Sequence, residues 1–218
     1  MKHDFWIQRW ELGEIGFHQD AINNYLINHW SQLSTTGGEK VFVPLCGKSK
    51  DMLWLNQQGH SVFGVELSEL ATRAFFSEHD LPFKESQEGG FTKFESDGYE
   101  LWCGDFFDLS AEDLDDIRFV YDRASLVALP PEMRESYAAR FKDLLVKGSK
   151  VLLVTMEYPQ QEMNGPPFSV SEEEVNTLYQ DSFSIECLET SDILEKNPRF
   201  KERGLSSMLE KSYLMVKK

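Results

Sequence analysis

The fold is decided by one stretch of sequence, KVFVPLCGKS at residues 40–49. Its Val, Phe and Leu side chains predict a buried strand at residues 40–45, and Cys46-Gly47-Lys48 predicts the turn that ends this strand. A helix is then expected from about Ser49 to Gln58, ending at Gly59. Strand, turn and helix in this order form the repeating unit of a parallel sheet that is covered by helices.

The same alternation continues outward from this unit as far as Met156. Further strands are predicted at residues 60–66, 99–103, 117–122 and 151–156, and helices are predicted to open at Ser68 and at Pro130-Pro131. Residues 84–98 are rich in glycine and charge and resemble a hairpin. The sequence therefore predicts an α/β fold with helices on both faces of a mostly parallel sheet.

The pattern changes after Tyr158. Ser171 and Glu174 have the spacing of a capping box and predict the start of a short helix. Two late strands, at residues 183–188 and 209–216, have no long helix between them, which predicts an antiparallel pair at one edge of the sheet.

Length and composition predict a single domain, residues 1–218, with 41% hydrophobic residues to build one core. Residues 1–10 lack the apolar run of a secretory signal, and no run reaches the roughly 20 apolar residues of a membrane span. Cys46, Cys103 and Cys187 lie far apart and are expected to be buried thiols in a reducing compartment. We expect a soluble, cytoplasmic monomer without membrane partners.

The formal net charge of −15 argues against nucleic acid as a partner, because proteins that bind nucleic acid usually present a basic surface to the phosphates. The five histidines show no spacing typical of metal ligands, so no metal site is expected.

The turn after the first strand carries one glycine, Gly47, where a dinucleotide site would show G-x-G-x-x-G. A P-loop is also excluded, because that motif needs glycine at the position of Phe42. The ligand at this turn therefore need not carry phosphate.

The second predicted strand ends in Glu66, about 20 residues after Gly47, where an acidic side chain can accept both hydroxyls of a ribose. The alternative is that Glu66 only stabilises the N-terminus of the next helix. Asp105 and Phe106, after the third strand, could hold an adenine, although aromatic residues after a strand are more often part of the core. Together these residues favour an adenosine ligand.

Arg123 follows the fourth strand, at the same edge of the sheet. Its guanidinium could form an ion pair with Asp122 or Asp105. It could equally bind a carboxylate of the ligand or stabilise a developing anion.

Several blocks of the sequence, in order along most of the chain, resemble thiopurine S-methyltransferases of the bacterial type. They are FWIQRW at 5–10, VPLCGKS at 43–49, GVE at 64–66, FDL at 107–109 and YDRASLVA at 121–128. The resemblance implies the Rossmann-like fold of class I S-adenosylmethionine-dependent methyltransferases. In that fold seven mostly parallel strands lie in the order 3-2-1-4-5-7-6, and an N-terminal helical lid segment, here residues 1–35, covers the cofactor.

The resemblance also implies roles for individual residues. Positions that match the cofactor site are Trp10, Leu45, Glu66 and Arg123, with Asp105 and Phe106 beside the adenine. Phe17 matches an aromatic residue near the methyl acceptor. Arg199 matches an arginine on the substrate side, although Arg203 competes for that role.

The activity that the resemblance implies is methyl transfer from S-adenosylmethionine to sulfur of small aromatic or heterocyclic thiols such as thiopurines. Selenium and tellurium compounds are further acceptors associated with bacterial relatives. In-line transfer depends chiefly on alignment, Arg123 or Arg199 could stabilise an anionic acceptor, and the sequence offers no evident catalytic base. Two alternatives stay open: a non-catalytic S-adenosylmethionine-binding regulator, and a methyltransferase acting on oxygen, nitrogen or protein side chains.

Overall fold

A single nine-stranded sheet forms the centre of the computed structural model, which describes residues 3–218. Met1 and Lys2, the start of the expected domain, lie outside the described residues. The strand order is β3-β4-β5-β2-β1-β6-β7-β9-β8. The strands are β1 Lys40–Pro44, β2 Ser61–Glu66, β3 Lys84–Glu88, β4 Phe91–Ser96, β5 Tyr99–Cys103, β6 Phe119–Arg123, β7 Lys150–Glu157, β8 Phe183–Asp192 and β9 Leu209–Lys217.

The predicted class of fold is confirmed, and the predicted count of seven strands is wrong. Strands β5-β2-β1-β6-β7-β9-β8 reproduce the expected order, with β9 antiparallel to both β7 and β8. The hairpin at residues 84–98 adds β3 and β4, and β4 pairs antiparallel with β5. Phe91 and Phe94 of β4 are buried in the two cores, so their burial holds this hairpin on the sheet.

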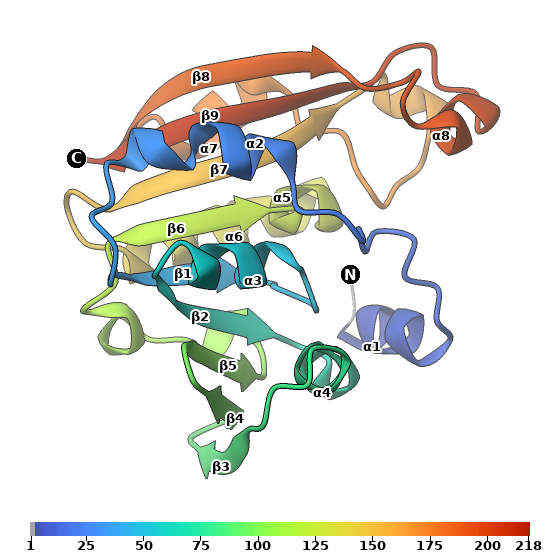
Figure 1. Cartoon of the computed structure of the whole chain (residues 1–218). Helices are drawn as coiled ribbons and strands as arrows, with labels where there is room; N and C mark the ends of the chain where they lie inside the picture. The colour runs from blue at the N-terminus through green and yellow to red at the C-terminus, as the bar shows by residue number, and fades with distance from the viewer. Residues whose placement is uncertain (1–2) are drawn as a thin grey trace.

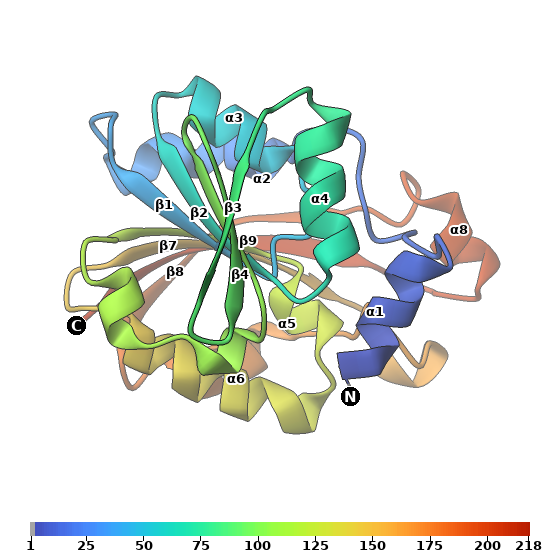
Figure 2. The same ribbon diagram turned by 90° about the horizontal axis from the view of Figure 1, so that it is seen from below.

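Helices cover both faces of the sheet (Figures 1 and 2). One face carries α2 Asn24–His29, α3 Asp51–Gln57 and α4 Glu69–Glu78, with the 3-10 helix Trp30–Leu33. The other face carries α6 Pro131–Leu144 and α7 Glu172–Tyr179, whose aromatic side chains pack on β6 and β7. The remaining helices are α1 His3–Glu11, α5 Ser125–Ala128 and α8 Pro198–Glu202, with 3-10 turns at Phe106–Asp108, Ala111–Leu114 and Gln160–Glu162.

The predicted helix caps are confirmed in part. Ser68 Oγ accepts a hydrogen bond from the Ala71 amide at the start of α4, and Ser171 Oγ accepts one from the Glu174 amide at the start of α7. The reciprocal half of the predicted capping box is wrong, because the carboxylate of Glu174 pairs instead with the buried Arg134 at 2.6 Å.

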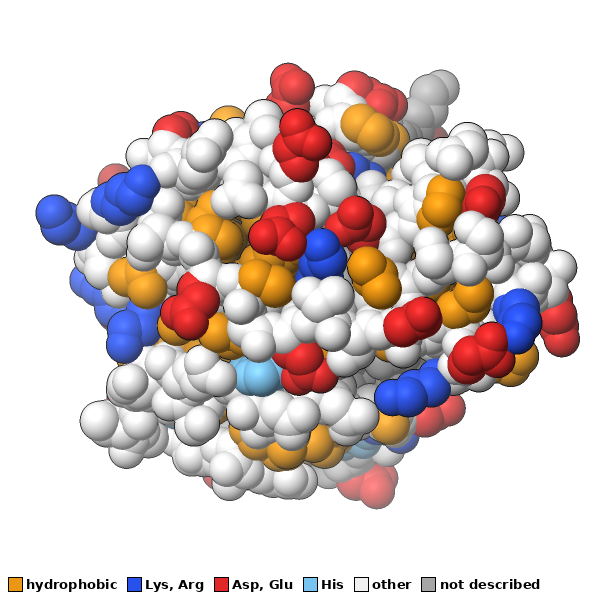
Figure 3. Space-filling model, turned by 90° about the horizontal axis from the view of Figure 1, so that it is seen from above, with side chains coloured by type: hydrophobic (Ala, Val, Ile, Leu, Met, Phe, Trp, Pro, Cys, Tyr) orange, Lys and Arg blue, Asp and Glu red, His pale blue; other side chains and the backbone are white. Residues whose placement is uncertain are grey.

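The edge strand β8 carries the acidic residues Glu186, Glu189 and Asp192. Figure 3 looks onto the side of the edge strand β8, where acidic side chains are scattered among basic and apolar ones. Charges such as Glu186 on an edge strand oppose pairing with another chain. Of the three cysteines expected to be buried thiols, Cys46 is buried, Cys103 is half-buried, and Cys187 on β8 is exposed, so the expectation is met only by Cys46. No helix within residues 3–218 is long and apolar enough to cross a membrane.

The parallel strands β1, β2, β5, β6 and β7 all end on one side of the molecule, where α1 and α8 also lie (Figure 1). This arrangement follows from the sequence, because each strand of a parallel unit is followed by a crossover that returns the chain to its start. The chain segments after the strands are therefore brought together at one edge of the sheet.

Candidate functional site

A cavity of about 480 Å³ lies at the carboxyl ends of the parallel strands. This volume lies within the range of small-molecule sites, roughly 300–1,000 Å³. Every site residue predicted from the sequence lines this cavity: Trp10, Phe17, Leu45, Glu66, Asp105, Phe106, Arg123, Arg199 and Arg203. The structure therefore brings together residues that are separated by up to 193 positions in the chain.

Two turns below the cavity have unusual backbone conformations. Leu45, directly after β1, has φ +47°, and Ala124, directly after β6, has φ +68°. The left-handed region costs a non-glycine residue about 1–3 kcal/mol, and such strain is concentrated at functional sites. Both strained residues line the cavity.

Gly47 completes the turn after β1 and allows close approach of the N-terminal segment. Its φ is +53°, and a Cβ atom at this position would lie 3.3 Å from Cζ2 of Trp10. Glycine thus meets both the backbone requirement and the contact with the indole ring. Trp10 is 7% exposed and lies against the turn.

Glu66 lies at the end of β2 and is 7% exposed. Its Oε2 accepts the Gly47 amide at 2.8 Å, and its Oε1 accepts the Ser68 amide at 2.7 Å. Burial raises the pKa of this carboxyl, while the two amide hydrogen bonds lower it. Each carboxylate oxygen has a second lone pair, so Glu66 can support the start of α4 and still accept hydroxyls of a ligand.

Asp105 and Phe106 follow β5. Asp105 Oδ1 accepts the Phe107 amide at 3.0 Å and opens the 3-10 turn. The Phe106 ring is buried, with its centroid 4.6 Å from that of Tyr137. Phe106 therefore belongs to the core and lines the cavity as well.

Arg123 is paired with a residue that the sequence analysis did not indicate. Its Nη1 donates to Oδ2 of Asp51 at 3.0 Å, and the Tyr121 hydroxyl donates to the same oxygen at 3.0 Å. The Asn23 amide donates to Oδ1 at 2.8 Å, and Asp51 is 1% exposed. The signal that could have found Asp51 is a carboxylate in the first turn of the helix that follows the decisive turn.

Asp122, one of the two predicted partners of Arg123, accepts the Tyr137 hydroxyl at 2.9 Å. Burial raises the pKa of Asp122 to about 6. Successive residues of a strand point to opposite faces of the sheet, so Arg123 and Asp122 are separated by the sheet itself.

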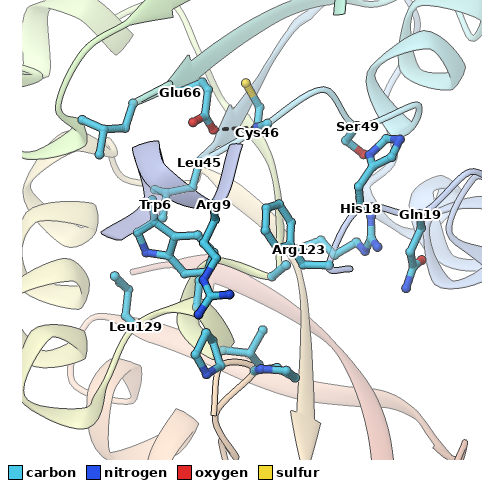
Figure 4. Close-up of a pocket in the computed structure, with 18 of the residues that line it drawn as sticks. Trp6, Arg9, His18, Gln19, Leu45, Cys46, Ser49, Glu66, Arg123 and Leu129 are labelled. Atoms are coloured by element: carbon cyan, nitrogen blue, oxygen red, sulfur yellow. Dashed lines mark hydrogen bonds between the residues drawn. The ribbon is translucent and has the colours of Figure 1, made fainter. Parts of the chain in front are cut away.

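Aromatic side chains of the N-terminal segment cover the cavity. The Phe17 ring packs edge-on against Trp6 and Trp10, with centroid distances of 5.4 and 5.3 Å. Figure 4 shows Trp6 and Arg9 of α1 within the pocket, between Glu66 and Leu129, with Arg123 to one side.

Arg199 and Arg203 both reach the cavity from α8 and its C-terminal end. Arg199 donates to the carbonyl of Gly16 and stacks on Phe200, with Cζ 4.7 Å from the ring centroid. Arg203 lies 6.0 Å from the same ring. Arg199 therefore ties the N-terminal segment to α8, whereas Arg203 does not contact this segment through any hydrogen bond of the described residues.

Further lining residues were not predicted as site residues. They include Arg9, His18, Gln19, Lys48, Asp51, Tyr121 and Glu210. His18 and Gln19 follow Phe17 directly, so proximity in sequence could have indicated them. Glu210 lies at the start of β9, which runs antiparallel to β7, so a search for residues at the carboxyl ends of parallel strands does not find it. Within residues 3–218 no cluster of three or more His, Cys, Asp or Glu side chains is arranged to hold a metal ion.

The chain matches the family described as Thiopurine S-methyltransferase (TPMT) over residues 1–218. It is 51% identical over 215 residues to the thiopurine S-methyltransferase of Pseudomonas aeruginosa, covering 99% of both chains. It is 48% identical over 216 residues to the enzyme of the same name from Nitrosospira multiformis, covering 99% of this chain and 98% of the relative.

Solved structures agree with the fold. A SAM-dependent methyltransferase from Anabaena variabilis superimposes with a TM-score of 0.67 at 13% identity, covering 99% of this chain and 95% of that one. A phosphoethanolamine N-methyltransferase of Haemonchus contortus, in complex with S-adenosylhomocysteine, gives a TM-score of 0.64 at 11% identity, covering 100% of this chain and 58% of that one. The structures show the fold, and the match along the whole sequence shows that the chain belongs to the thiopurine S-methyltransferase family.

Proposed function

We propose that this chain transfers the methyl group of S-adenosylmethionine to sulfur of small aromatic or heterocyclic thiols, of which thiopurines are the representative class. The observation that carries the proposal is a single cavity with a buried carboxylate, Glu66, on one side and a paired guanidinium, Arg123, on the other. The names of the relatives agree with this chemistry.

The residues fit the adenosine part of S-adenosylmethionine. Glu66 has lone pairs available for two ribose hydroxyls, since each carboxylate oxygen accepts one amide hydrogen bond. Asp105 and Phe106 would hold the adenine, and Leu45 and Trp10 would line the rest of the cofactor site. The bound cofactor supplies a methyl group on a positively charged sulfur, and no metal is needed for its transfer.

The chain's own contribution is alignment. The proposed acceptor side consists of Phe17, Arg123 and Arg199, which would hold an aromatic ring and a negative charge. Fixing two reactants in a near-attack geometry can supply about 7–11 kcal/mol of the barrier. The aromatic segment over the cavity would exclude water while the reactants are aligned.

We extend the proposal to the whole chain: a single domain that works as a cytoplasmic monomer, with residues 1–35 as the lid over the cofactor. The one sheet and the aromatic contacts of Trp6, Trp10 and Phe17 support this division of roles. Size-exclusion chromatography coupled to light scattering measures the oligomeric state.

The cofactor site is tested by calorimetry with S-adenosylhomocysteine. We expect wild-type protein to bind it saturably and Glu66→Ala to bind at least about 10-fold more weakly, because a hydrogen bond to a charged group contributes roughly 1.5–3 kcal/mol. Glu69→Ala, at the exposed start of α4, is the control for charge and should leave binding unchanged. An equal dissociation constant for the Glu66 variant would move the ribose contact elsewhere.

The acceptor class is tested with 6-mercaptopurine, selenite and tellurite as methyl acceptors, with products identified by mass spectrometry. Transfer to the thiopurine is the expected result. A protein that binds the cofactor but methylates none of these would be a non-catalytic binding protein.

A further inference from the structure

Glu210 stands apart from the other carboxylates of the cavity. It lies near the start of β9, is 8% exposed, and lines the cavity on the side formed by β6, β7, β9 and α8. Tyr25 Oη donates to its backbone carbonyl at 3.4 Å. Within residues 3–218 no hydrogen bond reaches its carboxyl oxygens, so both keep unused lone pairs on a residue that lines the cavity.

The neighbouring carboxylates are already engaged. Asp51 accepts three hydrogen bonds, from the Asn23 amide, the Tyr121 hydroxyl and the Arg123 guanidinium. Glu66 accepts an amide at each oxygen. With the ribose hydroxyls bound to Glu66 as proposed, Glu210 is the buried carboxylate near Arg123 and Asp51 that keeps unused acceptor capacity.

Two negative charges, Asp51 and Glu210, and one positive charge, Arg123, lie close together here, so the cluster has an excess negative charge when Glu210 is ionised. The groups that act electrostatically on Glu210 are Tyr25 of α2, Asp51 of α3, Tyr121 and Arg123 of β6, and Glu189 of β8. Arg123 is the cation in this set and is already paired with Asp51. Burial raises the pKa of the Glu210 carboxyl to about 6, Arg123 lowers it, and Asp51 and Glu189 raise it.

We propose that Glu210 is the general base of the reaction and accepts the thiol proton of the methyl acceptor, which then reacts as a thiolate beside Arg123. This inference rests on the proposed function. It supplies the base that the sequence did not reveal.

The step balances in atoms and charge. The S–H bond of the acceptor breaks, its proton moves to a carboxylate oxygen of Glu210, and the remaining electron pair of sulfur forms the new bond to the methyl carbon. The electron pair of the bond between methyl and donor sulfur stays on that sulfur, which becomes a neutral thioether. One positive charge disappears from the cavity and the proton on Glu210 cancels one negative charge, so the net charge of the cavity stays the same. The proton then passes from Glu210 to solvent.

The pKa of the Glu210 carboxyl suits the role of a base at neutral pH. A base works best when its pKa lies near the working pH, and a carboxyl titrating near 6 is ionised at neutral pH yet accepts a proton more readily than an exposed glutamate. Methyl acceptors that are already anionic would not need the base. The inference therefore concerns acceptors that enter the cavity as neutral thiols.

The first test measures ionisation of the bound acceptor without turnover. 6-Mercaptopurine changes its ultraviolet absorption when it loses a proton, and S-adenosylhomocysteine can occupy the cofactor site during the titration. Because Glu210, with a pKa of about 6, is ionised at neutral pH, its negative charge opposes ionisation of a neighbouring sulfur at equilibrium. We therefore expect the bound thiopurine to stay neutral to a higher pH on wild-type protein than on Glu210→Gln. Glu186→Gln removes an exposed carboxylate from β8 and should behave as wild type. Identical spectra on wild-type protein and Glu210→Gln would overturn the inference.

The second test follows kcat/KM against pH. General-base assistance is typically worth 10²–10⁴-fold, so we expect Glu210→Gln to be at least about 100-fold slower at pH 6.5. The difference should shrink toward pH 9, where the acceptor ionises in solution. Glu210→Asp keeps a carboxylate and should keep the fall in rate at acid pH, which covers the case in which Glu210→Gln does not fold. Methyl transfer with one pH profile in all three proteins overturns the role of Glu210 alone, whereas no binding and no transfer in any of them overturns the proposed function with it.

Discussion

Asp51→Asn offers a sharp test of how the cavity is held together. Asp51 is 1% exposed and accepts hydrogen bonds from the backbone of Asn23, the hydroxyl of Tyr121 and the guanidinium of Arg123. The substitution keeps the shape of the side chain but removes its charge, and turns one acceptor into a donor that faces other donors.

The expected loss is worked from these contacts. Breaking a buried ion pair by removing one partner costs about 3–5 kcal/mol, since the remaining charge is left without compensation. Glu210 also acts electrostatically on Arg123 and compensates part of its charge, so we expect the lower end, about 3 kcal/mol. Urea unfolding followed by tryptophan fluorescence measures the free energy of unfolding, with Trp10 and Trp30 as buried reporters.

Two further variants separate the ion pair from other effects. Asp20→Asn removes a carboxylate whose side chain is 94% exposed and 3.6 Å from Lys50, and should cost less than about 1 kcal/mol. Asp51→Asn combined with Arg123→Met should be more stable than Asp51→Asn alone, because the guanidinium no longer lies buried without the carboxylate of Asp51. A loss below about 1 kcal/mol for Asp51→Asn, or simple addition of the two losses in the double variant, would refute the reasoning.

Three other outcomes are expected. Gly47→Ala should displace the Trp10 ring, which lies 3.3 Å from the added Cβ, and weaken S-adenosylhomocysteine binding several-fold by calorimetry. The control Gly148→Ala, with φ +86° and no atom within 4 Å of the added Cβ, should cost only backbone strain of about 1–2 kcal/mol and leave binding intact. Equal effects of the two substitutions on binding would exclude the steric explanation. Arg199→Ala should raise the KM of both cofactor and acceptor in steady-state kinetics, since Arg199 also binds the carbonyl of Gly16, and Arg203→Ala should affect the acceptor alone; the reverse pattern would exchange their roles. Glu210→Gln should raise the free energy of unfolding by up to about 2 kcal/mol at pH 8 and by almost nothing at pH 4. Folding raises the pKa of the Glu210 carboxyl from 4.5 to about 6, so burying the charged form costs nothing below pH 4.5 and its full amount above pH 6. Unfolding curves that shift equally at both pH values would contradict this linkage.

Much of the fold could be predicted because the decisive signals are local. The run at residues 40–45 is apolar and ends in a glycine turn, so both the strand and the direction of the following helix follow from adjacent residues. The order of the seven main strands came from the family resemblance. The pairing of β4 with β5 was missed because residues 84–98 have a polar composition, and only the burial of Phe91 and Phe94 fixes them to the sheet.

The site residues that could be predicted from the sequence are those at the carboxyl ends of parallel strands. Glu66, Asp105 and Arg123 follow strand ends, so a topological rule indicates them from sequence alone. Asp51 and Glu210 could not be found in this way. Asp51 acts through contacts between segments far apart in sequence, and Glu210 belongs to a strand that runs in the opposite direction.

The most direct measurement uses the purified protein, S-adenosylmethionine with a deuterated methyl group, and an equimolar mixture of 6-mercaptopurine and hypoxanthine, which differ in sulfur and oxygen at one position. Mass spectrometry of the products identifies the atom that receives the label. The account predicts label on the sulfur of the thiopurine and none on hypoxanthine. Label on oxygen or nitrogen, or no labelled product from protein that binds the cofactor, would contradict it.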